Sequence, residues 1–135
     1  RYFRLTNLLL DQLKLSLPQE QVGQIFNSLA TNLAAEYAQA GAALPVEERL
    51  NLIQNVLQQE GFEVEWEKHN DHYLIREITC PYYHVGQSHP EICAVDQTLI
   101  SSVLAVPVEK IHCVLRGDAH CTYSIPASAI QEPEK

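Results

Sequence analysis

The sequence predicts an α+β domain in which helices lie apart from an antiparallel sheet. Apolar residues recur at helical spacing up to Gly61, and strict alternation of apolar and polar residues begins at Phe62. After that point, two pairs of strand-like segments flank one helical segment. We therefore expect N-terminal helices plus two β-hairpins forming an antiparallel sheet, with one helix between the hairpins.

Three helices are expected before the sheet. Residues 1–17 carry apolar side chains at a spacing close to 3.6 residues. The second helix, residues 18–41, has Ser16 as its expected N-cap and Gly41 as its expected left-handed C-cap. The third helix spans residues 45–61. Such apolar stripes are typical of core or dimer contacts and not of ligand sites.

The first hairpin is expected from residues 62–67 and 72–79, and its first strand alternates between apolar residues and glutamates. We expect Phe62, Val64 and Trp66 to face the core and the glutamates to face water. A helix then starts at Pro90 and has Cys93 in its first turn. A helix N-terminus stabilises negative charge, which favours a thiolate there.

The second hairpin predicts a specific pairing of cysteines. Its expected strands are residues 108–115 and 120–125, joined by a tight turn at Gly117-Asp118. Pairing Leu115 with Cys121 and Cys113 with Tyr123 would place both cysteines on the buried face as diagonal neighbours.

Composition narrows the class of protein. The formal net charge is −8, and only nine Lys and Arg residues are present, which argues against nucleic-acid binding by this chain. No apolar run is long enough to span a bilayer, and no signal-peptide cleavage pattern follows the first residues. We expect a cytoplasmic protein without a membrane partner. The sequence has no Met, so we also expect further material before Arg1.

The chemistry is expected between Cys80 and Cys121, a stretch that holds all four cysteines and four of the six histidines. Cys80 ends a strand, Cys93 starts a helix and Cys121 begins the last strand, so their thiols can converge at one end of the sheet. The spacing is C-x12-C-x27-C, unlike the close C-x2-C knuckle of common zinc sites. We expect metal ligands or redox thiols, with structural zinc and plain buried thiols as alternatives.

A family resemblance rests on motifs in this stretch: Cys80-Pro81, His89-Pro90-Glu91-Ile92-Cys93, Asp96, Val108 to His112, and Leu115-Arg116-Gly117-Asp118-Ala119-His120-Cys121. They resemble the sensor half of SufR-type regulators, bacterial winged-helix repressors related to the DeoR and ArsR groups. The resemblance implies a redox sensor that binds an oxygen-labile iron–sulfur cluster through Cys80, Cys93 and Cys121. It also implies a homodimer whose cluster controls DNA binding in transcription regulation.

The resemblance suggests a division of the chain. Residues 1–17 would form a linker or dimerisation helix, residues 18–126 the sensor domain, and residues 127–135 a flexible tail. DNA would be bound only through a winged-helix domain that is missing from this chain.

The fourth ligand of the cluster stays open at this stage. Cys113 could complete a four-cysteine metal site of the kind that clusters use, or it could be a small buried hydrophobe. The other candidates for completing the coordination are His84, His112, His120 and Asp118.

The sequence also contains candidate residues for two other classes of function. A small-molecule-binding or structural-zinc sensor of the vinyl-4-reductase-like type would use an apolar pocket. Its candidate lining residues are Trp66, Tyr73, Tyr82, Tyr83 and Tyr123. An enzyme with a cysteine nucleophile is disfavoured, because the adjacent pairs His112-Cys113 and His120-Cys121 would point to opposite faces of a strand. We therefore expect no enzymatic activity.

Overall fold

The computed structural model describes residues 2–131, apart from the side chain of Phe3, and it confirms the α+β class. The helices are α1 (Tyr2–Ser16), α2 (Gln19–Ala42), α3 (Val46–Gln59), α4 (Tyr83–Gly86) and α5 (Ala94–Leu104). The strands are β1 (Glu63–His69), β2 (His72–Thr79), β3 (Glu109–His112) and β4 (Cys121–Pro126). Three 3₁₀ turns complete the chain: η1 (Pro90–Cys93), η2 (Val114–Arg116) and η3 (Ala127–Ala129).

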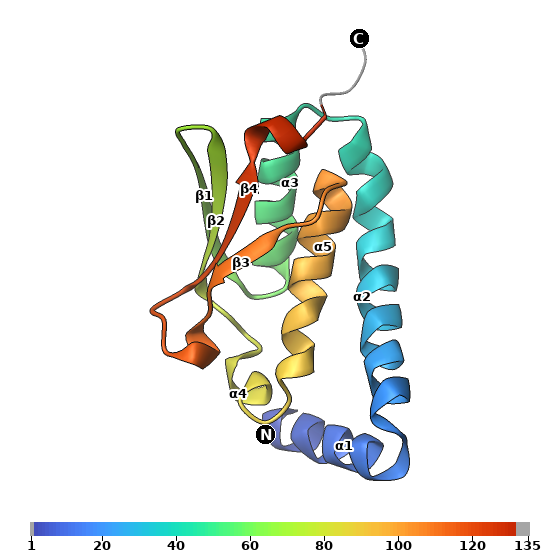
Figure 1. Ribbon diagram of the computed structural model, residues 1–135. Helices are drawn as coiled ribbons and strands as arrows, with labels where there is room; N and C mark the ends of the chain where they lie inside the picture. The colour runs from blue at the N-terminus through green and yellow to red at the C-terminus, as the bar shows by residue number, and fades with distance from the viewer. Residues whose placement is uncertain (1, 132–135) are drawn as a thin grey trace.

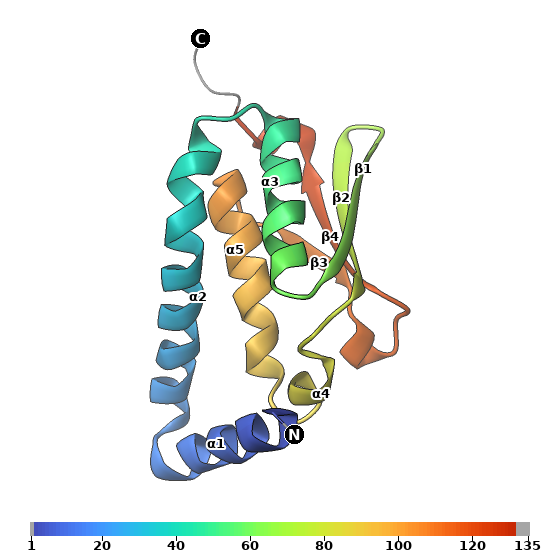
Figure 2. The ribbon, with the colours of Figure 1, turned by 180° about the vertical axis from the view of Figure 1, so that it is seen from behind.

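The four strands form one antiparallel sheet in the order β1-β2-β4-β3. The two expected hairpins are therefore present, and they join where β2 pairs with β4. Helices α3 and α5 cover one face of the sheet, and α2 packs on the far side of α5 (Figures 1 and 2). Helix α1 turns away from α2 and runs across the end of the molecule, next to α4.

The core lies between the sheet and the helices α3 and α5. Alternate strand residues point into it, as the pleat requires. The strand contributions that are buried include Val64, Tyr73, Ile75, Tyr123 and Ile125, and the helical ones include Leu50, Ile53, Leu57, Ile100 and Leu104. Full burial of such a side chain stabilises the fold by about 1.5–3 kcal/mol. The glutamates of β1 are exposed, as predicted.

The start of α2 differs from the prediction, since Pro18 and not Ser16 occupies the N-cap, without a side-chain capping bond. Helix α3 and the left-handed backbone of Gly61 just after it, with φ of +97°, agree with the expected helix end.

Helix α2 ends at Ala42, close to the predicted end, but Gly41 does not adopt the predicted left-handed cap conformation. It lies buried within the helix, and a Cβ built on it would be 2.8 Å from Cγ1 and 3.0 Å from the carbonyl oxygen of Val103 in α5. The absence of a side chain lets the two helices approach closely. This close contact between α2 and α5, which are far apart in the sequence, requires a residue without a side chain at position 41.

Replacing Gly41 with alanine should therefore destabilise the chain by about 1–3 kcal/mol, because the new methyl group meets backbone as well as side chain. Gly23→Ala is a matched control on the same helix, where an added Cβ has no heavy atom within 4 Å. That variant should gain about 0.5–1 kcal/mol from helix propensity. Urea unfolding followed by circular dichroism measures both, and a shift in the same direction for both would contradict the packing explanation.

The second hairpin corrects the predicted register. Strand β3 ends at His112, Lys110 pairs with Tyr123, and a bulge separates Lys110 from the pair of His112 and Thr122. The predicted pairings of Cys113 with Tyr123 and of Leu115 with Cys121 are wrong.

The reason is a wide loop, residues 113–120, in place of a tight turn. The Asp118 carboxylate accepts a hydrogen bond from the Cys113 N–H at 2.8 Å, and the Asp118 N–H donates to the Cys113 carbonyl at 3.2 Å. Gly117, with φ of +96°, ends η2 inside this loop. The side chain of Asp118 thus closes the loop at Cys113, before the strands can continue to pair.

The chain after β4 is packed as far as the structure describes it. Ile130 is buried, and the Arg49 guanidinium donates a hydrogen bond of 2.7 Å to the Gln131 carbonyl. Residues 132–135 of the expected tail, and Arg1 of the expected linker helix, lie outside the described residues. No helix among residues 2–131 is long and apolar enough to cross a membrane.

Candidate functional site, a buried cluster of cysteines and carboxylates

The structure brings the four cysteines together between the sheet, α4 and the start of α5. We call Cys80, Cys93, Cys113 and Cys121 the cysteine cluster. None of them forms a disulfide, and Cys113 and Cys121 are buried while the other two are partly buried. Charge on Cys121 raises the pKa of Cys80 and of Cys93, and charge on Cys113 raises the pKa of Cys93 and of Cys121, so Cys121 lies within electrostatic range of the other three thiols.

Cys80 follows the last residue of β2, where Pro81 stops the strand. Burial raises the pKa of its thiol to about 12, and a hydrogen bond from the Tyr82 backbone partly opposes that rise. The thiol is therefore protonated at neutral pH unless a cation offsets the burial.

Cys93 is the residue immediately before α5, close to the predicted position. Its Sγ lies 3.5 Å from where a Cβ on Gly86 of α4 would be, so the missing side chain of that glycine leaves room for the sulfur. The prediction that the helix N-terminus favours a thiolate is wrong for this structure. Burial raises the pKa of Cys93 to about 11 and outweighs the opposing charge of Lys110.

Cys121 begins β4 with its side chain buried on the core side of the sheet. Its sulfur accepts a hydrogen bond from the Val114 N–H at 3.4 Å, across the loop that joins β3 to β4. Burial raises its pKa to about 11, whereas this hydrogen bond and Lys110 lower it. Backbone N–H groups thus reach the sulfurs of both Cys80 and Cys121, an arrangement that stabilises anionic sulfur.

Two carboxylates accompany the cysteine cluster, and sequence reasoning did not single them out as site residues. Glu77 on β2 is 1% exposed, and Asp96 in the first turn of α5 is 4% exposed. The pattern that could have revealed Glu77 is strand alternation, because Tyr73, Ile75 and Glu77 occupy successive inward positions of β2.

Burial and, to a smaller extent, the neighbouring Asp96 together raise the pKa of Glu77 to about 10. Neither carboxylate oxygen of Glu77 accepts a hydrogen bond from an N–H or hydroxyl group of the described residues, and its side-chain hydrogen bond with the Asp96 carboxyl requires one of the two groups to keep its proton. Asp96 differs, because its Oδ2 accepts a hydrogen bond of 2.8 Å from the Tyr123 hydroxyl. A buried carboxyl group without a donor is costly in its ionised form.

Lys110 supplies a positive charge near the cysteine cluster and Glu77. Its Nζ lies 5.3 Å from the centre of the Tyr123 ring, and its charge lowers the pKa values of Cys93, Cys121 and Glu77. The bulge after Lys110 leaves this side chain opposite Tyr123, on the same side of the sheet as the cysteines.

The other predicted candidates for a fourth ligand lie elsewhere. His112, Asp118 and His120 line a hollow on the outer face of the sheet, together with Arg76 and Thr122. Asp118 also accepts the hydrogen bond from Cys113 that closes the loop. His84 on α4 is exposed and stacks edge-on against Tyr83 at 5.7 Å. His112 is the register partner of Thr122, so strand alternation places it on the opposite face of the sheet from Cys121.

The predicted aromatic residues do not gather around one ligand pocket. Tyr123 is in the core, Tyr83 is exposed, and Trp66 contacts Tyr73 edge-on at 6.1 Å. Tyr82 alone of the five lines the cavity between α2, α3 and α5, whose volume is about 70 Å³. Pockets for drug-sized ligands measure roughly 300–1,000 Å³, so this cavity does not favour the small-molecule alternative.

Within residues 2–131, no three His, Cys, Asp or Glu side chains are placed together as ligands of a single metal ion. In a [4Fe–4S] cluster each thiolate binds a different iron, so its cysteine ligands need not share one metal ion.

Comparison with known proteins adds no further identification, because no protein-family model and no curated protein matches this chain.

Proposed function

We propose that this chain is the sensor domain of a bacterial transcriptional regulator and that it binds an iron–sulfur cluster through Cys80, Cys93 and Cys121. The observation that carries the proposal is that Cys80 and Cys93, which belong to two separate elements, both lie within electrostatic range of Cys121 on a third, in a partly buried region of the chain. The proposal assigns no catalytic residue.

The residues present fit such a group in their chemistry. Cysteine thiolates are the usual ligands of iron–sulfur clusters, and hydrogen bonds to their sulfurs tune the cluster's potential. The N–H groups of Tyr82 and Val114 are directed to Cys80 and Cys121. When bound, the cluster would supply a redox-sensitive link between the end of β2, the start of α5 and the start of β4.

Contacts from the cysteine region to α1 support a sensing role. Lys14 of α1 forms an ion pair of 2.9 Å with Glu91 of η1, two residues before Cys93. His89, which is 2% exposed, has its Nε2 3.0 Å from Oδ1 of Asp11 in α1, without the alignment of a hydrogen bond. Because Cys93 is the last residue of η1, a movement of that cysteine would reach α1 through these contacts. In the proposal, α1 passes the change to a DNA-binding winged helix that precedes it.

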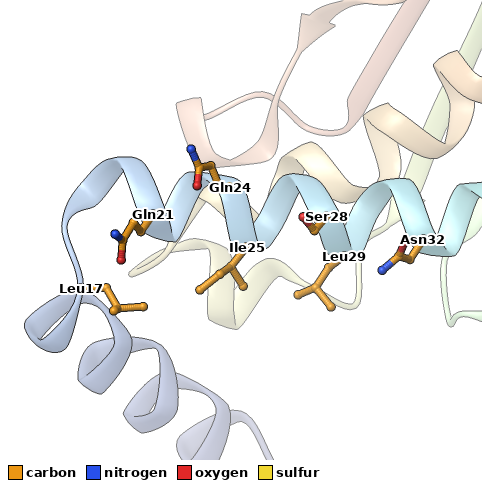
Figure 3. A pocket seen from close by; sticks show the side chains of 7 residues that line it. All are labelled: Leu17, Gln21, Gln24, Ile25, Ser28, Leu29 and Asn32. Atoms are coloured by element: carbon orange, nitrogen blue, oxygen red, sulfur yellow. The ribbon is translucent and has the colours of Figure 1, made fainter.

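A homodimer forms part of the proposal, and the surface of α1 and α2 supports it. Leu5, Leu8 and Leu9 of α1 are more than half exposed, and Leu29 and Leu33 of α2 are about half exposed. Near the bend between the two helices, Leu17, Ile25 and Leu29 line a shallow hollow of about 460 Å³ (Figure 3). Exposed leucines at this density are typical of a protein interface.

The cluster proposal is tested by anaerobic reconstitution with iron and sulfide. The parent chain should become brown and bind iron and sulfide, and each of Cys80→Ser, Cys93→Ser and Cys121→Ser should reduce the visible absorption by about ten-fold or more. Cys113→Ala is the matched control, since it removes a thiol of the same cysteine cluster. Zinc binding without colour, or retention of the cluster in all three serine variants, would reject the proposal.

The dimer is tested by light scattering during size exclusion. Leu5→Glu combined with Leu9→Glu should convert a dimer into a monomer, because the two charges would lie one helical turn apart within the apolar surface. Ile111→Glu, on the 41% exposed Ile111 of β3, is a control outside that surface. A parent chain that is already monomeric would remove this part of the proposal.

A further inference from the structure

We propose that helix α1 is a releasable cover over α4 and η1, and that its detachment makes the thiol of Cys93 more accessible. The detachment is a swing about Leu17 and Pro18, the two residues that join α1 to α2. The inference rests on the proposed function only for the role of α1 in signalling. Its test uses the metal-free chain, so the result does not depend on whether a cluster binds.

The first argument is the shallow packing of α1, which crosses the end of the molecule beside α4 (Figures 1 and 2). None of the described side chains of residues 2–16 is fully buried, and the better covered ones, such as Leu10 and Leu13, are still partly exposed. Helices α2, α3 and α5 each contribute several buried residues. An element with few buried contacts opens at a lower free-energy cost than the core. Helix α1 is therefore the long helix that we expect to detach first.

The second argument is that charged contacts connect α1 to η1 and to the residue before it. The Lys14 ammonium lies 2.9 Å from Oε1 and 3.0 Å from Oε2 of Glu91. One turn earlier on α1, Oδ1 of Asp11 lies 3.0 Å from Nε2 of His89. Except for His89, these side chains are about one-third exposed or more. An exposed ion pair shifts an equilibrium by about five-fold at most, so these contacts direct α1 to its position without locking it there.

The third argument is that the contact buries polar atoms without aligned hydrogen bonds. His89 is 2% exposed, and neither of its ring nitrogens has a hydrogen-bond partner among the described residues. The same holds for Oδ1 of Asn7, one turn before Asp11 on α1. Burying such atoms is unfavourable, and detachment of α1 would let water reach them. This gain offsets part of what the ion pairs lose, so the attached and detached positions of α1 are close in free energy.

Two short elements connect the cover to Cys93. His89 directly precedes η1, which ends at Cys93, and its N–H donates a hydrogen bond of 2.9 Å to the Val85 carbonyl of α4. The Cys93 sulfur lies beside Gly86 of the same helix. Helix α4 and η1 have four residues each, and η1 has no buried residue. They have few contacts of their own to keep them in place, so the partly buried Cys93 becomes more exposed once α1 has left.

The test reverses one charge and then restores the pair in the opposite sense. Lys14→Glu places two carboxylates together and should release α1, whereas Lys14→Glu combined with Glu91→Lys should hold it again. Arg4→Glu is the matched control, because it makes the same change of charge on an exposed residue of the same helix. All variants are compared as metal-free full chains at low ionic strength, where charged contacts are screened least.

The measurements are amide hydrogen exchange of residues 2–16 and the rate at which iodoacetamide alkylates each cysteine, both followed by mass spectrometry. Circular dichroism shows whether each variant folds. In Lys14→Glu, the amides of α1 should exchange about five-fold faster than in the parent, and Cys93 should be alkylated about five-fold faster. The buried Cys113 and Cys121 should react at the parent rate, because the sheet stays folded.

The charge swap should return both rates to within about two-fold of the parent, and Arg4→Glu should match the parent. The proposal is overturned if Lys14→Glu is no faster than Arg4→Glu, or if the charge swap stays as fast as Lys14→Glu. Equal acceleration of all four cysteines would also overturn it, since that pattern indicates loss of the fold and not release of α1.

Faster exchange of α1 without faster alkylation of Cys93 would overturn the link between the cover and the cysteine. Failure of the proposed function has a different signature, namely a parent chain that binds no cluster on anaerobic reconstitution. The two failures are therefore distinguishable.

Discussion

At pH 8, the metal-free Glu77→Gln variant should be more stable than the parent chain by about 5 kcal/mol. Glu77 is almost fully buried, and burial together with Asp96 raises its pKa from 4.5 to about 10. The folded chain therefore keeps the Glu77 proton at neutral pH, whereas the unfolded chain has released it. Glutamine has no proton to lose, so the variant avoids this difference between the two states.

The sign of the pH dependence follows from the direction of that shift. Between about pH 5 and pH 9 the unfolded chain binds fewer protons at Glu77 than the folded chain, so the free energy of unfolding falls as pH rises. The slope from a single such group is at most about 1.4 kcal/mol per pH unit. Below the ordinary pKa of glutamate both states are protonated, and the contribution of Glu77 to the slope disappears.

Urea unfolding at pH 5, 6, 7 and 8 measures this prediction. The difference between the parent and Glu77→Gln should be small at pH 5 and should grow with pH, whereas Glu63→Gln should follow the parent throughout. Measurements stop at pH 8 because the cysteine thiols, whose pKa values burial also raises, would contribute at higher pH. Parallel curves for the parent and Glu77→Gln would show that Glu77 is not buried as described.

The second large effect is expected at Tyr123. Tyr123→Ala should lower the free energy of unfolding by about 3–5 kcal/mol, since it removes an aromatic ring that is 0% exposed and leaves a cavity under β4. Tyr123→Phe should lower it by about 1–3 kcal/mol, because the ring remains but the buried Asp96 carboxylate loses the hydroxyl at 2.8 Å. Burial and the nearby carboxylates raise the pKa of Tyr123, so the hydroxyl stays protonated and can donate.

This hydrogen bond also joins the two elements that carry Cys121 and Cys93, since Tyr123 lies on β4 and Asp96 on α5. In Tyr123→Phe, the thiols should therefore react faster with an alkylating reagent under native conditions. Thermal unfolding and alkylation followed by mass spectrometry measure the two effects, with Tyr83→Phe on the exposed Tyr83 as the control. An unchanged stability of Tyr123→Phe would show that Asp96 finds another donor or is protonated.

Local patterns account for the parts of the fold that were predicted. The helices α1, α2 and α3 and the hairpin β1–β2 follow from apolar periods of 3.6 and 2 residues, which each segment carries within itself. The same alternation continues through Tyr73, Ile75 and Glu77, although Glu77 was not predicted as an inward residue. The short helix α4 was not predicted, because its one turn is too short to show a period.

The sequence by itself determined the α+β class, the order of its elements and the stretch that contains the cysteines, because those features depend on neighbours along the chain. Only the tertiary structure decided that Gly41 packs against Val103, that Asp118 closes a wide loop at Cys113, and that Glu77 faces Cys121. Each of these contacts depends on which helix or strand approaches from elsewhere in the chain. The burial that keeps the thiols and Glu77 protonated has the same origin, because it arises only when the sheet and α5 come together.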